Sequence, residues 1–73
     1  MEYNTVVSSN IKAVGYDDET FTLEVAFTNG TTYRYLSVPR SIFDGLLQAD
    51  SPGRYFNAEI KGGNFPYFKL DPS

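Results

Sequence analysis

A segment of strictly alternating polarity that runs directly into a turn signal is the strongest restriction on the fold of this chain. Residues 21–27 carry apolar side chains at every second position, which is the period of a half-buried β-strand. Asn29-Gly30 follows, and a second run with alternating aromatic residues begins at Thr31. The pattern predicts an antiparallel hairpin with strands over 21–27 and 31–38, and it places Phe21 on the same face as Phe27.

The register of this hairpin follows from the side chains that each loop length would pair. A two-residue loop would place Arg34 opposite Val25, among the buried side chains. A three-residue loop over 28–30, with Gly30 in the left-handed conformation, separates the apolar side chains from the charged ones. We therefore predict the three-residue loop. It pairs Val25 with Tyr33, Leu23 with Tyr35, and Glu24 with Arg34.

The remaining elements follow from periodicity and capping signals. Apolar residues at helical spacing predict a helix over 39–49, and Ser51-Pro52 predicts a second helix capped by Ser51 that extends to Ile60. Gly62-Gly63 would supply its left-handed C-cap. Strands are expected over 10–16 and 66–70. The predicted fold class is α+β, a small antiparallel sheet of three to four strands with two short helices on one face, in the order β-β-β-α-α-β.

Length and composition restrict the chain further. Its 73 residues form one domain over 1–73, with a core over about 8–70, and 41% of them are hydrophobic. The chain lacks cysteine and histidine, which excludes disulfides, thiol nucleophiles, zinc fingers and Ser-His-Asp triads within it. We expect a cytoplasmic protein with no secretory signal, no membrane-spanning segment, no metal and no cofactor.

The net charge of −3 disfavours nonspecific binding to a polyanion, since such binding depends on lysine and arginine. A local basic patch remains compatible with this sum. Arg54, Lys61 and Lys69 fall together in the C-terminal third, whereas the acidic excess lies at 17–19, 44, 50 and 71.

An ordered set of short motifs resembles the KTSC domain family, whose members include the C-terminus of some lysyl-tRNA synthetases and small bacterial and phage proteins. The central Tyr33-Arg34-Tyr35 is similar to the Tyr-x-Tyr motif of that family. The other matching segments are 8–11, 15–17, 23–25, 29–30, 38–39, 46–47, 51–57 and 60–62. The resemblance covers nearly the whole chain. It implies a domain without catalytic residues, for which RNA binding is suggested by the attachment to a synthetase.

For two tyrosines of the central motif, packing in the core is favoured over stacking on a ligand. Tyr33 and Tyr35 could stack on nucleobases, but the predicted register places both on the buried face, where large rings usually serve packing. Arg34 lies on the other face. Pairing with Glu24 and contact with a phosphate are the alternatives for its guanidinium.

The candidate ligand-binding residues are otherwise basic, aromatic or amide side chains of the two helices and the tail. Arg54 lies at a helix start, where free amide groups and the helix dipole favour an anion, although Phe56 and Ile60 of the same segment would simply face the core. The full set of candidates is Arg54, Tyr55, Asn57, Lys61, Arg34, Arg40 and Tyr67.

Catalytic constellations are not expected. Asp17-Asp18 lies in a surface turn, where adjacent carboxylates point apart, and Ser8-Ser9-Asn10 has no base nearby and fits a strand entry. We therefore interpret the chain as a non-enzymatic binding module for RNA or a nucleotide-like anion. The alternative is a protein-interaction or self-associating module, for example a phage-encoded protein that binds a host protein.

Overall fold

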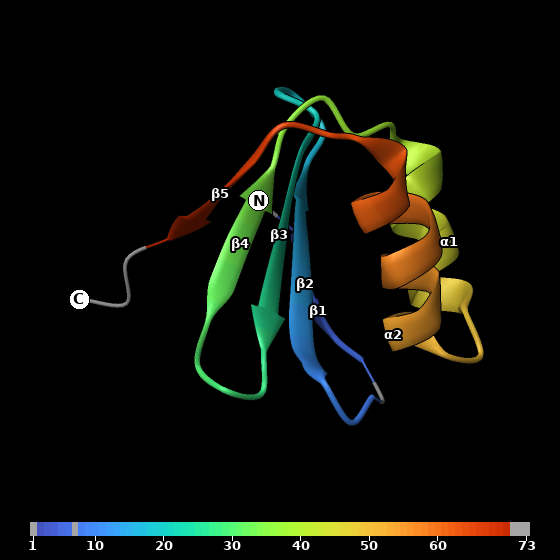
Figure 1. The fold of residues 1–73 in the computed structure, drawn as a ribbon. Helices are drawn as coiled ribbons and strands as arrows, with labels where there is room; N and C mark the ends of the chain where they lie inside the picture. Colours follow the sequence, from blue (N-terminus) through green and yellow to red (C-terminus); the bar gives the residue numbers. More distant parts are fainter. Residues whose placement is uncertain (1, 7, 71–73) are drawn as a thin grey trace.

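Five strands form one antiparallel sheet in the computed structural model, which describes residues 2–6 and 8–70 (Figure 1). Their order in the sheet is their order in the chain. The strands are β1 (Glu2–Thr5), β2 (Ile11–Asp17), β3 (Thr22–Phe27), β4 (Thr32–Tyr35) and β5 (Tyr67–Leu70). The α+β class and the edge position of the C-terminal strand are confirmed. The strand number of three to four is too low, because β1 was not predicted.

Two helical segments cover one face of the sheet and run antiparallel to each other (Figure 1). The first is α1 (Arg40–Gln48). The second begins with α2 (Pro52–Tyr55) and continues as the π-helical turn η1 (Phe56–Ile60) and the 3₁₀ turn η2 (Lys61–Gly63). In the described part of the chain, no helix is long and apolar enough to cross a membrane.

The ends of the second helical segment differ from the prediction in two details. Ser51 is the N-cap residue and Pro52 occupies the first turn, but the Ser51 hydroxyl makes no capping hydrogen bond. The left-handed residue at the other end is Asn64, with a φ of 58°, rather than Gly62 or Gly63. Asparagine tolerates this conformation because its short polar side chain can hydrogen-bond locally.

The register of the β3–β4 hairpin is the predicted one. Val25 pairs with Tyr33, and Glu24 pairs with Arg34. Gly30 closes the three-residue loop with a φ of 91°, a conformation that an L side chain rarely adopts. The separation of apolar from charged side chains therefore predicted the pairing correctly.

Phe21 does not share the buried face of β3, and this prediction is wrong. Its φ of 56° turns the backbone out of the extended conformation just before β3 begins at Thr22, and its ring is 55% exposed. Its carbonyl oxygen accepts a hydrogen bond of 2.8 Å from the Val38 N–H. The backbone of Phe21 therefore joins the hairpin to the loop before α1, and the ring takes no part in the core.

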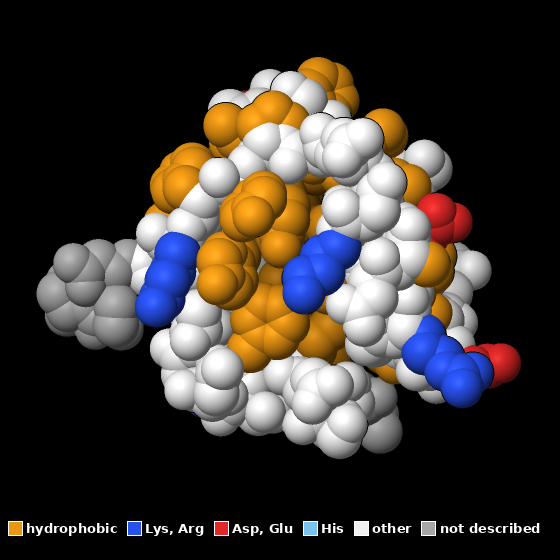
Figure 2. All heavy atoms as spheres, in the orientation of Figure 1, with side chains coloured by type: hydrophobic (Ala, Val, Ile, Leu, Met, Phe, Trp, Pro, Cys, Tyr) orange, Lys and Arg blue, Asp and Glu red, His pale blue; other side chains and the backbone are white. Residues whose placement is uncertain are grey.

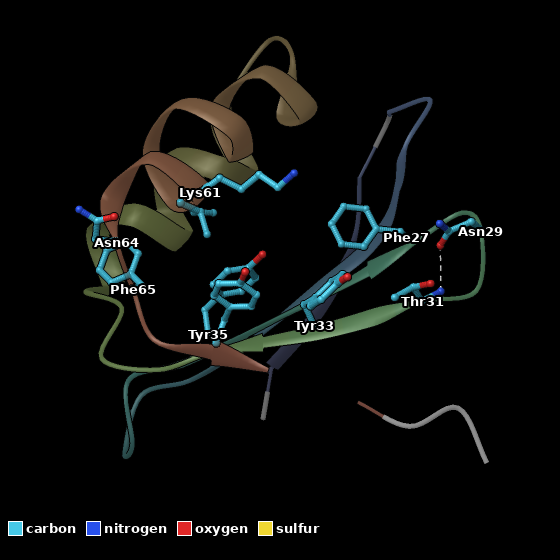
Figure 3. Close-up of a pocket in the computed structure, with 10 residues that line it drawn as sticks. Phe27, Asn29, Thr31, Tyr33, Tyr35, Lys61, Asn64 and Phe65 are labelled. Carbon is cyan, nitrogen blue, oxygen red and sulfur yellow. Dashed lines mark hydrogen bonds between the residues drawn. The ribbon is translucent and has the colours of Figure 1, made fainter. Parts of the chain in front are cut away.

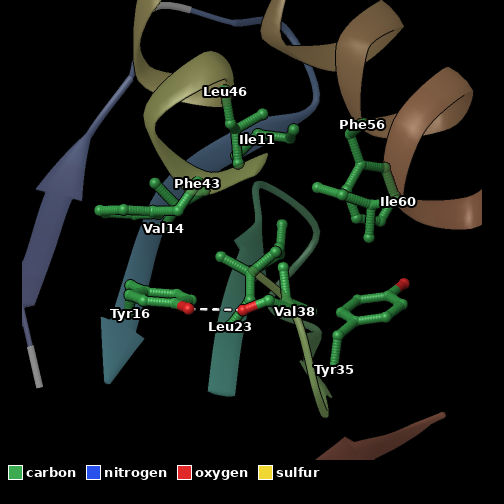
Figure 4. Close-up of a cluster of buried hydrophobic side chains, with 11 residues drawn as sticks. Ile11, Val14, Tyr16, Leu23, Tyr35, Val38, Phe43, Leu46, Phe56 and Ile60 are labelled. Atoms are coloured by element: carbon green, nitrogen blue, oxygen red, sulfur yellow. Dashed lines mark hydrogen bonds between the residues drawn. The ribbon is translucent and has the colours of Figure 1, made fainter. Parts of the chain in front are cut away.

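The core lies between the helices and the middle of the sheet (Figure 4). The Tyr16 ring stacks on Phe43 of α1, with ring centroids 5.1 Å apart, and its hydroxyl donates a hydrogen bond to the Val38 carbonyl. Phe56 and Ile60 face the core from η1, as predicted. The buried apolar residues are Ile11, Val14, Tyr16, Leu23, Val25, Tyr35, Val38, Phe43, Leu46, Phe56 and Ile60.

The opposite face of the sheet carries one row of side chains that crosses all five strands. Its members are Tyr3, Gly15, Glu24, Arg34 and Phe68, in that order. The Tyr3 hydroxyl donates to Glu24 Oε1 over 2.8 Å, and Arg34 Nε donates to Glu24 Oε2 over 3.0 Å. Because Gly15 has no side chain, the Tyr3 ring can lie across the strand between β1 and Glu24.

Candidate functional site

A hollow of about 710 Å³ lies on the helix-covered side of the sheet, between its β4–β5 edge and the turns η1 and η2 (Figure 3). We call it the aromatic cleft. Its volume is typical of small-molecule sites. The lining residues are Phe27, Asn29, Thr31, Tyr33, Tyr35, Ile60, Lys61, Asn64, Phe65 and Tyr67.

Strand pairing assembles the aromatic wall of this cleft. Tyr35 lies directly opposite Tyr67 in the β4–β5 register, and their rings stack with centroids 5.3 Å apart. Tyr33 meets Tyr67 edge to face at 6.0 Å and Phe27 at 5.9 Å. Because successive side chains of a strand alternate between faces, residues 33, 35 and 67 all point to the same side of the sheet.

Tyr33, Tyr35 and Tyr67 differ in how deeply they are buried. Tyr35 is 3% exposed and belongs to the core, as predicted. Tyr33 is only half-buried, so the core interpretation holds for it in part. Tyr67 is 63% exposed, although one side of its ring covers Tyr35. The Tyr67 ring therefore offers its other side to a flat ligand.

The Tyr35 phenol at the base of the cleft wall is neutral at physiological pH. Burial raises the pKa of Tyr35 to about 12, and the neighbouring Tyr67 and Tyr33 phenols contribute to the rise. A neutral phenol is both a hydrogen-bond donor and an acceptor.

The charged groups at the cleft are cationic. Lys61 lines the cleft from η2, and Lys69 lies opposite Tyr33 on β5, on the cleft side of that strand. Among the described residues that line the cleft, none carries a carboxylate. Figure 2 shows basic side chains on both sides of an apolar strip on this face. The arrangement suits a ligand that combines a flat ring with negative charge.

The π-helical turn η1 determines where Lys61 lies. The Lys61 N–H donates to the carbonyl oxygens of Phe56 and Asn57, so the turn is wider than an α-helical one. Phe56 and Ile60 both remain buried against the sheet, and the next residue, Lys61, reaches the cleft.

The hairpin loop adds a polar end to the cleft. The Asn29 side-chain oxygen accepts a hydrogen bond of 3.0 Å from the Thr31 N–H, which leaves its amide nitrogen to donate (Figure 3). A second hollow of about 380 Å³ adjoins this end, since Phe27, Asn29 and Lys61 line both. Asn57, a predicted ligand-binding residue, lines the second hollow only.

Arg34 and Arg40 form ion pairs that belong to the fold. Arg34 pairs with Glu24 on the opposite face of the sheet, so the pairing alternative holds and its guanidinium does not reach the cleft. Arg40 pairs with Asp18 and, at 3.2 Å, with Asp44. Arg40, at the start of the first predicted helix, was expected to add to an anion site at Arg54, but the two lie apart, because α1 and α2 run antiparallel and begin at opposite ends of the helical layer (Figure 1).

Tyr55 and Arg54 lie outside the cleft as well. The Tyr55 hydroxyl lies against Gly45 of α1, in space that a larger residue at position 45 would fill, so the ring packs between the two helical segments. Arg54 is exposed on α2 and lines neither hollow. Of the seven predicted ligand-binding residues, the structure brings Lys61 and Tyr67 together in the aromatic cleft.

Several residues in or beside the cleft were missing from the predicted set. Lys69 follows Tyr67 at the spacing that places both on one face of a strand, so the alternation contained the signal. Phe65, Asn64 and Asn29 had no comparable signal, since they lie in turns. The site is therefore built on the predicted tail strand more than on the predicted helix start.

The other polar motifs have structural roles. The Ser8 hydroxyl accepts hydrogen bonds from the Asn10 and Ile11 N–H groups at the entry to β2. Asp17 accepts one from the Glu19 N–H within the turn. The described residues contain no cluster of three or more acidic side chains that could hold a metal ion.

Comparison with known proteins gives one family. The sequence profile of the KTSC domain matches residues 7–65. The crystal structure of a KTSC domain protein from Yersinia pestis superposes with a TM-score of 0.89 at 37% identity and covers 96% of this chain and 97% of its own.

Curated relatives are of two kinds. An uncharacterized protein of Stutzerimonas stutzeri is 44% identical over 64 residues, which is 88% of this chain and 90% of the relative. The lysine–tRNA ligase of Nostoc punctiforme is 43% identical over 54 residues, which is 74% of this chain but only 10% of the ligase. Domains similar to this chain therefore occur both as small proteins and as a small part of a larger enzyme.

Proposed function

Because the chain belongs to the KTSC domain family, whose members include both small proteins and a part of lysine–tRNA ligases, we propose that it is a binding module without catalytic activity and that its ligand is RNA or a nucleotide. The aromatic cleft is the observation that carries this proposal. It combines the exposed Tyr67 ring with the ammonium group of Lys61, and Lys69 lies beside the cleft, opposite Tyr33 in the β4–β5 pair. Nucleotides present the matching pair of groups, a flat base and a phosphate.

Two further observations support the proposal. The ligase relatives act on tRNA by name, which makes a nucleic-acid ligand plausible for a domain that they share. The polar motifs around Ser8, Asp17 and Arg40 are accounted for by turns and ion pairs of the fold. The cytoplasmic location expected from the sequence is part of the same proposal.

Fluorescence anisotropy tests this function with labelled single-stranded RNA, tRNA and a nucleotide panel, each at low and physiological salt. We expect weak, saturable binding that falls as salt rises, because only a few cations reach phosphates. Tyr67→Ala should weaken it, whereas Lys12→Ala, which removes an exposed lysine outside both hollows, should leave it unchanged. If no nucleic acid or nucleotide binds saturably at low salt, the proposal is wrong.

The alternative function, protein interaction or self-association, has a different surface in its favour. Tyr3 and Phe68 are exposed on the face of the sheet that no described helix covers, and Phe21 is exposed beside β3. A protein partner would bind through a few apolar anchors with less dependence on salt. Phe68→Ser would then abolish binding, and Tyr67→Ala would not.

A further inference from the structure

We infer that the aromatic cleft takes up one unpaired base from within a single strand, with a phosphate on each side of that base. This inference rests on the proposed function and narrows it. It distinguishes single-stranded RNA from duplex RNA and from free mononucleotides.

The first argument is the way in which the Tyr67 ring is presented. One side of the ring stacks on Tyr35 and Tyr33 meets the ring edge to face, yet Tyr67 as a whole is 63% exposed, so much of the ring remains open to receive a base. A base inside a duplex already has neighbours on both of its faces, whereas an unstacked base has a face to offer. A stack of Tyr35, Tyr67 and base therefore requires an unpaired nucleotide.

The second argument is the placement of the two lysines. Lys61 lines the cleft from η2, on its helical side, and Lys69 lies beside the cleft on β5, on the same side of the sheet as Tyr67. The rings of Tyr33 and Tyr67 lie in the sheet wall beside Lys69, and Figure 2 shows the apolar strip between basic side chains. One phosphate cannot occupy both sides of the strip. A base within a strand has a phosphate toward each side, and a mononucleotide has only one.

The third argument is the polarity of the cleft lining. The Asn29 amide nitrogen remains available as a donor, and the Tyr33 phenol lies within the same wall. Carbonyl oxygens and ring nitrogens of bases accept such hydrogen bonds. The absence of carboxylates among the described lining residues makes a cationic ligand the poorer fit.

Three probes test the inference by anisotropy: a short oligouridylate, the same strand paired with oligoadenylate, and uridine monophosphate. The single strand should bind more than about tenfold more tightly than the duplex, which is within the range for one base–aromatic stack. Its affinity should fall with salt at a log-log slope of about −1.4 if two phosphates are neutralised, since each phosphate of a single strand contributes about −0.7, and the affinity of the mononucleotide, which has one phosphate, should fall less steeply.

Variants separate stacking from charge. Tyr67→Ala should weaken binding of the single strand about 5- to 150-fold with an unchanged salt slope. Lys61→Ala and Lys69→Ala should each reduce the slope by about 0.7, and Lys12→Ala should not. Circular dichroism verifies that each variant is folded.

The outcomes distinguish the inference from the proposed function. Equal or tighter binding of the duplex, or equal salt slopes for single strand and mononucleotide, would overturn the inference and leave the proposed function standing. The absence of saturable binding for all three probes at low salt would overturn both.

Discussion

Phe21 holds a left-handed backbone conformation, with a φ of 56°, and exposes 55% of its surface. This conformation brings Cβ close to the next carbonyl oxygen and costs an L residue on the order of 1–2 kcal/mol, less for asparagine. We expect Phe21→Asn to raise the free energy of unfolding by up to about 1 kcal/mol, since the ring contributes little burial. Urea denaturation measures the change. A clear loss of stability would show that the ring has a packing role.

Tyr35 links the packing of the core to pH. Its phenol ionises near pH 10 in an unfolded chain and near 12 in the folded protein, so the folded state retains a proton that the unfolded state releases. The resulting contribution to stability is complete below about pH 10 and is lost as the pH rises toward 12. Denaturation across this range should show a smaller alkaline loss in Tyr35→Phe than in the parent chain.

Part of the alkaline loss should remain in Tyr35→Phe, because other tyrosines respond in the same direction. A hydrogen bond to Glu24 raises the pKa of Tyr3, and burial raises the pKa of Tyr16 and of Tyr55. If the variant and the parent chain lost the same stability between pH 10 and 12, the Tyr35 phenol would not be the group that titrates.

At the scale of elements, β1 is held to the sheet by a contact between Tyr3 and Gly15. A methyl group at position 15 would lie 2.5 Å from two carbons of the Tyr3 ring, and that ring carries the hydroxyl bound to Glu24. Gly15→Ala should therefore destabilise the chain when Tyr3 is present and not when Tyr3 is alanine. We expect a coupling free energy of about 1 kcal/mol in a double-mutant cycle. Additive effects of the two substitutions would show that the ring moves aside at no cost.

The start of α2 depends on the backbone instead of a side-chain cap. The Tyr55 N–H donates to the Ser51 carbonyl over 3.0 Å, and the Ser51 hydroxyl makes no capping bond. Ser51→Ala should therefore change the free energy of unfolding by less than about 0.5 kcal/mol, where a capping serine would give about 1 kcal/mol. The midpoint of chemical denaturation measures the difference. A loss of about 1 kcal/mol would show that the Ser51 hydroxyl does cap the helix.

At the scale of the whole molecule, basic residues are divided between the fold and the cleft. The radius of gyration is 11.0 Å, close to the value of about 11 Å for a compact chain of this length, so the cleft is a depression in one packed body. Arg40 pairs with acidic residues at one end of α1 and lies over the Phe43 ring at 5.4 Å, whereas Lys61 lines the cleft.

This division predicts opposite effects for two charge-neutralising substitutions. Arg40→Gln should lower the free energy of unfolding by up to about 1 kcal/mol, since its ion pairs are partly exposed, and should leave RNA binding unchanged. Lys61→Gln should weaken RNA binding and leave stability nearly unchanged, because Lys61 is exposed. Denaturation and anisotropy titrations on both variants measure the four effects. A loss of RNA affinity in Arg40→Gln would instead place the ligand at the start of α1.

The elements with local signals were predictable from the sequence. Period-two alternation, the Asn29-Gly30 turn and the need to separate Arg34 from apolar side chains together determined the β3–β4 register. Helical spacing and Ser51-Pro52 placed the helices to within a residue or two at their starts. These features depend on interactions between residues that are close together in the sequence.

The tertiary structure alone decided what covers each face and which distant residues meet. Alternation assigns Tyr33 and Tyr35 to one face, but it does not say that Tyr67 lies opposite Tyr35, or that Tyr35 is buried while Tyr67 remains exposed. Strand β1 gains its place from a tyrosine that crosses a glycine on the neighbouring strand, which no local pattern contains. Lys61 and Tyr67 line one cleft, with Lys69 beside it, because β5 returns to pair with β4 after the helices. The location of the site is therefore determined by tertiary contacts. These contacts join segments that lie far apart in the sequence.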